Sequence, residues 1–202
     1  PYPWYVLIEL SSPRREALRG TLEDVLVRGA EKGLVGDAAI ADSLEQAKAF
    51  WRIRESISES ERAMGPAAQH DVSVPVAVMP RFMIEAAAAC EARFPGTHAS
   101  GFGHLGDGNV HFHVRAPAGA DPARWYAEEA PGITRFVDDL VVALGGSISA
   151  EHGIGQMKLA ELERLSSPAR LAALRGVKAG LDPQGLFNPG KLVVLAQTPP
   201  SP

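Results

Sequence analysis

The chain has 202 residues, of which 46% are hydrophobic, enough for one sizeable core but too few for two large domains. No run approaches the roughly eighteen apolar residues of a membrane span, and a net charge of -4 with dispersed basic residues argues against nucleic-acid binding. The chain starts without an initiator Met or a signal-peptide pattern, so we expect a piece of a longer protein. The single cysteine, Cys90, is predicted to be a small buried hydrophobe in a reducing, cytoplasmic setting.

The N-terminal third predicts two strands and two helices. Residues 4–11 are β-rich and mostly apolar, which predicts an inner strand, and residues 36–41 predict a weaker second strand. Helical spacing predicts helices over residues 14–33 and 42–62, the second capped by the Asp or the Ser at its start.

Predicted strands and helices also alternate in the rest of the chain. Residues 71–78 predict a third strand, made irregular or placed at an edge by its proline, and residues 80–94 predict a third helix. Helices follow in the second half of 121–146 and near 167–180, and residues 193–202 read as a disordered tail. This order predicts an α+β fold, a ferredoxin-like antiparallel sheet with helices packed on one face.

A histidine-rich stretch, GFGHLGDGNVHFHV at residues 101–114, holds three of the six histidines. Its central GDGN favours a tight turn between two strands, so His104 before the turn and His111 after it should face one another. Asp107 is interpreted as a turn residue rather than a ligand.

Strand alternation after the turn places Asn109, His111 and His113 on one face and apolar side chains on the other. Clustered neutral imidazoles suit a divalent metal such as zinc, and the missing carboxylate must come from elsewhere. Glu151 in SISAEHGIGQMK is the obvious source, and His152 beside it suits a general base. Without the first cluster, the Glu-His pair reads as a solvated loop.

Three ordered motifs carry a family resemblance. GHLGDGNVHFHV, AEHGIGQMK and LDPQGLFNPGKL resemble the C-terminal portion of FAD-linked oxidases of the vanillyl-alcohol-oxidase superfamily, as do FWRIRES (50–56) and HDVSVPV (70–76). The nearest branch is the D-2-hydroxy-acid dehydrogenases: D-lactate dehydrogenase, the glycolate oxidase FAD subunit and D-2-hydroxyglutarate dehydrogenase. The resemblance implies that residues 1–192 form the cap or substrate domain, and that an N-terminal FAD-binding domain, missing from this chain, holds most of the flavin.

The resemblance also implies a reaction. The family oxidises a D-2-hydroxy acid to the 2-oxo acid by hydride transfer to FAD. A divalent metal, often zinc, binds the substrate carboxylate and hydroxyl, and its ligands correspond to His104, His111 and Glu151, with His152 as the base. The residues expected to contact the substrate are Arg54, Ser58, Asn109 and His113. Those expected to lie near the flavin are Lys158, Asn188 and Lys191.

Two departures leave the particular acid open. Gln69 replaces a lysine that D-2-hydroxyglutarate dehydrogenases use for a distal carboxylate, and His113 stands where an asparagine often occurs. We expect a quinone, flavoprotein or cytochrome as electron acceptor, a cytoplasmic location that does not exclude a peripheral membrane position, and no nucleic-acid partner; a homodimer is left open. The competing hypotheses are a stand-alone His/His/Glu metallohydrolase and a non-catalytic binding module.

Overall fold

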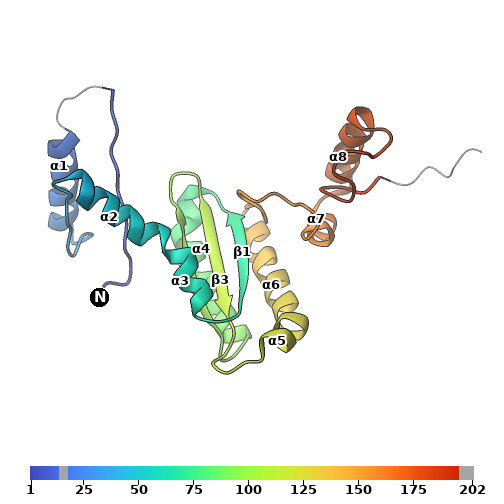
Figure 1. Cartoon of the computed structure of the whole chain (residues 1–202), viewed down its shortest axis with the longest axis horizontal. Coiled ribbons are helices and arrows are strands. Elements are labelled where there is room, and N and C mark those ends of the chain that lie inside the picture. Colours follow the sequence, from blue (N-terminus) through green and yellow to red (C-terminus); the bar gives the residue numbers. More distant parts are fainter. Residues whose placement is uncertain (14–17, 196–202) are drawn as a thin grey trace, which may run out of the picture. The chain divides into compact units, whose positions relative to one another are not determined.

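The computed structural model describes residues 1–13 and 18–195, which fall into two units, Pro1–Met64 and Gly65–Pro202 (Figure 1). The predicted tail from residue 196 onward, and the first residues of the helix predicted at 14–33, lie outside the described residues. Val193, which begins the predicted tail, is buried.

The first unit is helical: α1 (Leu18–Glu31), α2 (Leu44–Glu55) and α3 (Ile57–Ala63). Ser43 caps α2, its hydroxyl accepting the backbone N–H of Gln46 at 3.2 Å. The helix predicted over 42–62 is interrupted at Ser56, whose hydroxyl turns back to the carbonyl of Ile53 at 2.8 Å, a bond that competes with helical pairing.

The two strands predicted in this unit are wrong. Residues 4–11 and 36–41 form no ladder, and Tyr5 and Val6 are about three-quarters exposed. β-propensity is an expression of packing on a pleated surface, and here no described strand of the unit offers a partner.

The second unit is built on an antiparallel sheet of β1 (Ala67–Ser73), β2 (His98–His104) and β3 (Asn109–Arg115), in the order β1-β3-β2. A long helix, α4 (Met79–Arg93), joins β1 to β2, and β3 fills the place between them. This is the split β-α-β unit of ferredoxin-like folds. The strand predicted at 71–78 lies earlier than expected, since the chain turns into the short 3-10 helix η1 (Val76–Val78) after Pro75.

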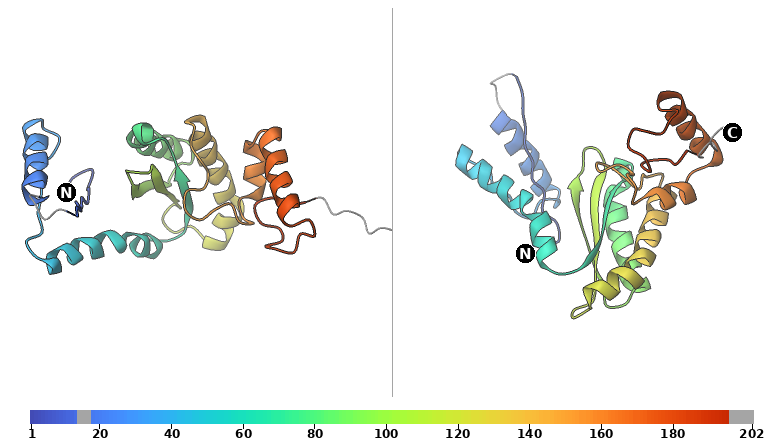
Figure 2. Two further views of the ribbon diagram at one scale, coloured as in Figure 1. Left: turned by 90° about the horizontal axis from the view of Figure 1, so that it is seen from above. Right: turned by 45° about the vertical axis from the view of Figure 1, so that its right-hand side comes forward.

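The remaining helices are α5 (Pro122–Glu128), α6 (Ala130–Ala143), α7 (Leu159–Leu165) and α8 (Pro168–Leu181). In Figure 1, α4 lies behind the sheet and α6 runs beside β1, and Figure 2 shows the same elements from two further sides. Among the described residues, no helix has the length and apolarity needed to cross a bilayer.

The core lies between the sheet and these two helices. Val72, Val110 and Phe112 project from the sheet onto α4 and α6, and the Phe82 and Phe112 rings lie 5.5 Å apart. Cys90 is fully buried there, as predicted. The α+β class, with an antiparallel sheet and helices packed against it, is confirmed. Because α4 and α6 cover one face of the sheet, the residues that alternate with this core point to the opposite face.

Candidate metal and substrate site

The histidine hairpin forms as the turn chemistry predicts. His104 pairs with Asn109, and His111 pairs with Phe102, so the two histidines share the face opposite α4 and α6 as diagonal neighbours. In the turn, the carboxylate of Asp107 accepts the backbone N–H of Asn109 at 2.9 Å, in agreement with its interpretation as a turn residue.

A second segment reaches the same face from beyond α6. The backbones of Ser73 and Ser147 exchange two hydrogen bonds of 3.0 and 2.8 Å, which attaches residues 147–152 to the edge of β1. One consequence is that Glu151 Oε2 lies 3.8 Å from His111 Nε2.

The three predicted ligands therefore converge. His104, His111 and Glu151 each offer one ligand atom, and these atoms lie within 4.8 Å of one another. These three residues are called the ligand group below. Zinc holds nitrogen and oxygen ligands at about 2.0–2.2 Å, so small side-chain rotations would close this group around one ion. The donor set of two imidazoles and a carboxylate suits such a cation and leaves one of the four positions of a tetrahedral zinc ion unfilled.

His152 lies beside this group. Its ring centroid is 6.3 Å from that of His111, and its side chain is 70% exposed, so a small molecule at the ligand group could reach it. Glu151 and His152 thus both lie beside His111.

Asn109 and His113 are both buried on the same face. Both polar atoms of the Asn109 side chain lack a hydrogen-bond partner among the described residues, and His113 packs edge-on against Phe102 with ring centroids 5.4 Å apart. Gln69, opposite His113 in the register, is exposed.

Lys158 and the NPGK turn meet the loop that carries Glu151. The Lys158 amine donates to the carbonyls of Asp71 and Ile148 at 3.2 and 2.6 Å. Lys191 pairs through its amine with Gln156, and the next residue bonds to the Gly155 carbonyl at 2.9 Å. Asn188 occupies a left-handed conformation in the same turn, with φ of 44°. Two motifs distant in sequence are therefore adjacent.

Arg54 and Ser58 belong to the other unit, where Arg54 lies in the last turn of α2 and Ser58 in the first turn of α3. The ligand group lies wholly in the second unit.

Comparison with known proteins agrees with this architecture. Residues 1–192 match the family described as FAD linked oxidases, C-terminal domain. The chain belongs to this family. Among its relatives, proteins named D-2-hydroxyglutarate dehydrogenase from Stutzerimonas stutzeri and Xanthomonas citri are 35% and 37% identical over 94% and 95% of the chain. The mitochondrial protein of that name from Arabidopsis thaliana is 35% identical over 94%. The chain spans about 40% of the length of the two bacterial relatives and 32% of the plant one.

Sequence reasoning missed one residue of this FAD-linked oxidase domain. Asp71 lies directly opposite His111 in the β1–β3 register, with its side chain only 4% exposed. It stands among the residues of the HDVSVPV motif, but its place beside the ligand group depends on strand pairing.

His70, the residue before Asp71, is a buried core residue of the FAD-linked oxidase domain. Its Nδ1 lies 2.9 Å from the Phe112 carbonyl and its Nε2 lies 3.3 Å from the Thr134 hydroxyl. Burial lowers the pKa of His70 to about 4, so this ring is a neutral core group.

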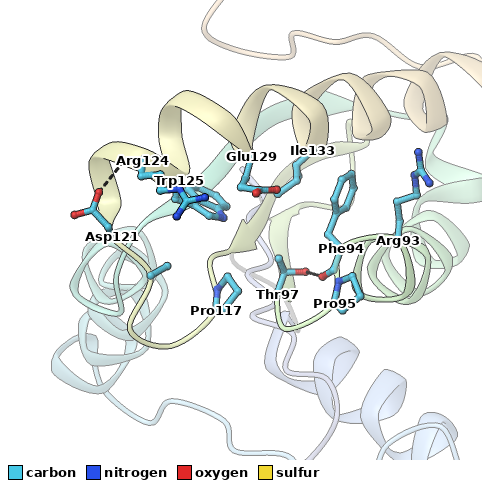
Figure 3. A pocket seen from close by; sticks show the side chains of 11 residues that line it. Arg93, Phe94, Pro95, Thr97, Pro117, Asp121, Arg124, Trp125, Glu129 and Ile133 are labelled. Carbon is cyan, nitrogen blue, oxygen red and sulfur yellow. Dashed lines mark hydrogen bonds between the residues drawn. The ribbon is translucent and has the colours of Figure 1, made fainter.

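A cavity of about 390 Å³ opens at the end of the hairpin that lies away from the ligand group (Figure 3). Thr97 and Pro117, which flank the outer ends of β2 and β3, line it together with Trp125 and Arg124 of α5. Seven-residue strands at about 3.3 Å per residue separate this end from His104, so the cavity is not part of the ligand group.

Proposed function

We propose that this domain provides the substrate side of a flavin-dependent dehydrogenase that oxidises a D-2-hydroxy acid to the 2-oxo acid. The observation that carries the proposal is the convergence of His104, His111 and Glu151 within 4.8 Å, with His152 alongside. Family membership and the printed names of the relatives support it.

The ligand group would hold a divalent cation, zinc being the best match to its donors. When bound, the cation would polarise the substrate hydroxyl and carboxylate, and FAD, held mainly by a separate FAD-binding domain, would accept the hydride.

His152 would remove the hydroxyl proton. Its Nδ1 faces Asp71 Oδ2 at 3.6 Å, which leaves Nε2 as the nitrogen able to accept a proton from a substrate. A base held in this way would act on a hydroxyl whose oxygen lies at the ligand group.

For the substrate carboxylate we propose Arg54, whose planar guanidinium suits bidentate contact, with Ser58 four residues further along the chain. Asn109 and His113 would supply further contacts. The buried Asn109 amide supports this, since an unsatisfied buried amide costs about 1–3 kcal/mol and a polar ligand would satisfy it.

On the flavin side we propose Lys158, Asn188 and Lys191. Their support is the contact between the NPGK turn and the segment that follows Glu151.

The acid itself stays a proposal at the level of class: lactate, glycolate or 2-hydroxyglutarate type. Gln69 offers no cation for a second carboxylate, which favours an acid without one. The electron acceptor, a homodimer and the cytoplasmic location also stay predictions.

Metal binding tests the proposal. The chain freed of metal with a chelator should take up one equivalent of Zn²⁺, followed by calorimetry, and His111→Ala or Glu151→Ala should lose this uptake because each removes one of three ligands. His98→Ala is the matched control, since His98 lies on the same hairpin but pairs with Glu91 at 3.0 Å and should leave uptake unchanged.

Absence of Zn²⁺ uptake by the parent chain would contradict the metal site and favour a non-catalytic binding module. Hydrolysis of an ester panel by the Zn²⁺-loaded chain, lost in His111→Ala, would favour a metallohydrolase instead.

A further inference from the structure

Asp71 lies beside the ligand group without belonging to it. Register places it directly across from His111, and the backbone of its own strand is tied to the Glu151 loop, since the Ala150 N–H donates to the Asp71 carbonyl at 3.3 Å. A carboxylate with 4% side-chain exposure is costly to bury unless its oxygens are used.

One oxygen of this carboxylate holds the loop. Asp71 Oδ2 accepts the backbone N–H groups of Glu151 and His152 at 2.9 and 2.8 Å, and it faces His152 Nδ1 at 3.6 Å. Charge-assisted bonds of this kind are short and strong, so they fix the backbone from which both functional side chains project.

The other oxygen has no such role. Asp71 Oδ1 is buried and accepts no hydrogen bond among the described residues, and it faces His111 Nδ1 at 3.9 Å. The opposite nitrogen of the same ring, Nε2, faces Glu151. The His111 ring therefore lies between one carboxylate that is buried and one that belongs to the ligand group.

A cation also lies at this strand, since the Lys158 amine donates to the Asp71 backbone carbonyl at 3.2 Å. A buried carboxylate with an oxygen that accepts no other hydrogen bond is a strong acceptor for an imidazole N–H.

We propose that Asp71 is a positioning residue for this site: Oδ1 accepts a hydrogen bond from the Nδ1–H of His111 and so presents Nε2 to the cation, while Oδ2 holds Glu151 and His152 in place. The proposal rests on the metal site of the proposed function. A neutral imidazole carries one N–H, so a carboxylate at one nitrogen leaves the lone pair on the other. Histidine ligands with such a partner are better oriented and more basic. The 3.9 Å separation would have to shorten as the ring settles on the ion.

Substitution by asparagine separates the two roles. In Asp71→Asn the amide oxygen can still accept the Glu151 and His152 N–H groups, but the NH₂ group that replaces Oδ1 cannot accept a hydrogen bond from the Nδ1–H of His111. Asp71→Ala removes both. Asp182→Asn is the matched control, because Asp182 is also buried and also accepts two backbone N–H groups, those of Leu186 and Phe187.

Titration of the 202-residue chain with Co²⁺, followed by the visible absorption of the bound ion, gives the affinity. We expect Asp71→Asn to weaken Co²⁺ binding by about 10–100-fold, Asp71→Ala to weaken it further, and Asp182→Asn to leave it unchanged. In the Zn²⁺-loaded parent, ¹⁵N-histidine NMR should show His111 protonated at Nδ1 and bound through Nε2. Backbone amide signals of Glu151 and His152 should be retained in Asp71→Asn and shifted in Asp71→Ala.

The outcomes distinguish a failure of the positioning role of Asp71 from a failure of the proposed metal site. A parent chain that binds no Co²⁺ overturns both. A parent that binds Co²⁺ while Asp71→Asn binds it equally well, or in which His111 coordinates through Nδ1, overturns the positioning role and leaves the metal site standing. Equal weakening by Asp71→Asn and Asp182→Asn would show a general loss of stability and also overturn it.

Discussion

Buried carboxylates in the second unit differ in how their surroundings satisfy them. The Lys178 amine, with two backbone N–H groups, lowers the pKa of Asp182 despite its burial. Burial instead raises the pKa of Asp138 to about 7, and the neighbouring Glu161 adds to this effect against Lys158. Asp138 is therefore a group whose charge the folded state disfavours.

A pH dependence follows from Asp138. The unfolded side chain loses its proton near its ordinary pKa, about 4, while the folded one keeps it to about 7, so stability falls as pH rises through this window. Asp138→Asn should remove this loss, which at about 1.4 kcal/mol per pKa unit is on the order of a few kcal/mol. Urea unfolding of parent and variant between about pH 4 and pH 7.5 measures it. Asp139→Asn, at the neighbouring half-exposed position, is the control; an identical slope for parent and Asp138→Asn would contradict the prediction.

The hairpin is the element on which the ligand group depends, and at one position its turn leaves no room for a side chain. Gly108 has a φ of +74°, and a Cβ placed there would lie 2.0 Å from the Val74 carbonyl oxygen. Gly106, two residues earlier in the same turn, would meet nothing within 4 Å. The two glycines form a natural pair for comparison.

Gly108→Ala should lower the free energy of unfolding by at least about 1–3 kcal/mol, since the new methyl group adds backbone strain and a clash with the backbone. It should also weaken Zn²⁺ uptake, because the turn sets the spacing of His104 and His111. Gly106→Ala should change neither by much. Denaturant unfolding and calorimetry of both variants check this, and equal effects at the two positions would count against it.

At the scale of the whole molecule, the two units differ in how much they bury. In the described part of the first unit, α1, α2 and α3 contain no buried residue, whereas α6 alone contains five, among them Ile133, Val137 and Val141. Stability need not be uniform in such a chain, because local opening costs least where few apolar contacts are lost.

Amide hydrogen exchange should show this difference. In the 202-residue chain, amides of α1–α3 should exchange well before those of β3 and α6, whose protection should approach that of global unfolding. Mass spectrometry of peptides after timed exchange measures both. Equal protection of the two sets would mean that the units unfold together.

Patterns confined to neighbouring residues predicted this chain well. The 106–109 turn, the alternation of histidines with core residues on β3, and the helix at 80–94 all formed, because turn chemistry and periodicity act between residues a few positions apart. The approach of Glu151 to the hairpin histidines was also predicted, both from the residue types and from the family resemblance.

Long-range pairing decided the rest. Residues 4–11 have the composition of a strand but no strand partner in their unit, and Asp71 gained its place beside His111 only when β1 paired with β3. Local sequence predicted the histidines of the proposed metal site and the turn that gathers two of them. Which carboxylate lies beside His111 depended on the register between strands about forty residues apart in the chain, because cross-strand neighbours are chosen by the packing of the whole sheet and not by local preference.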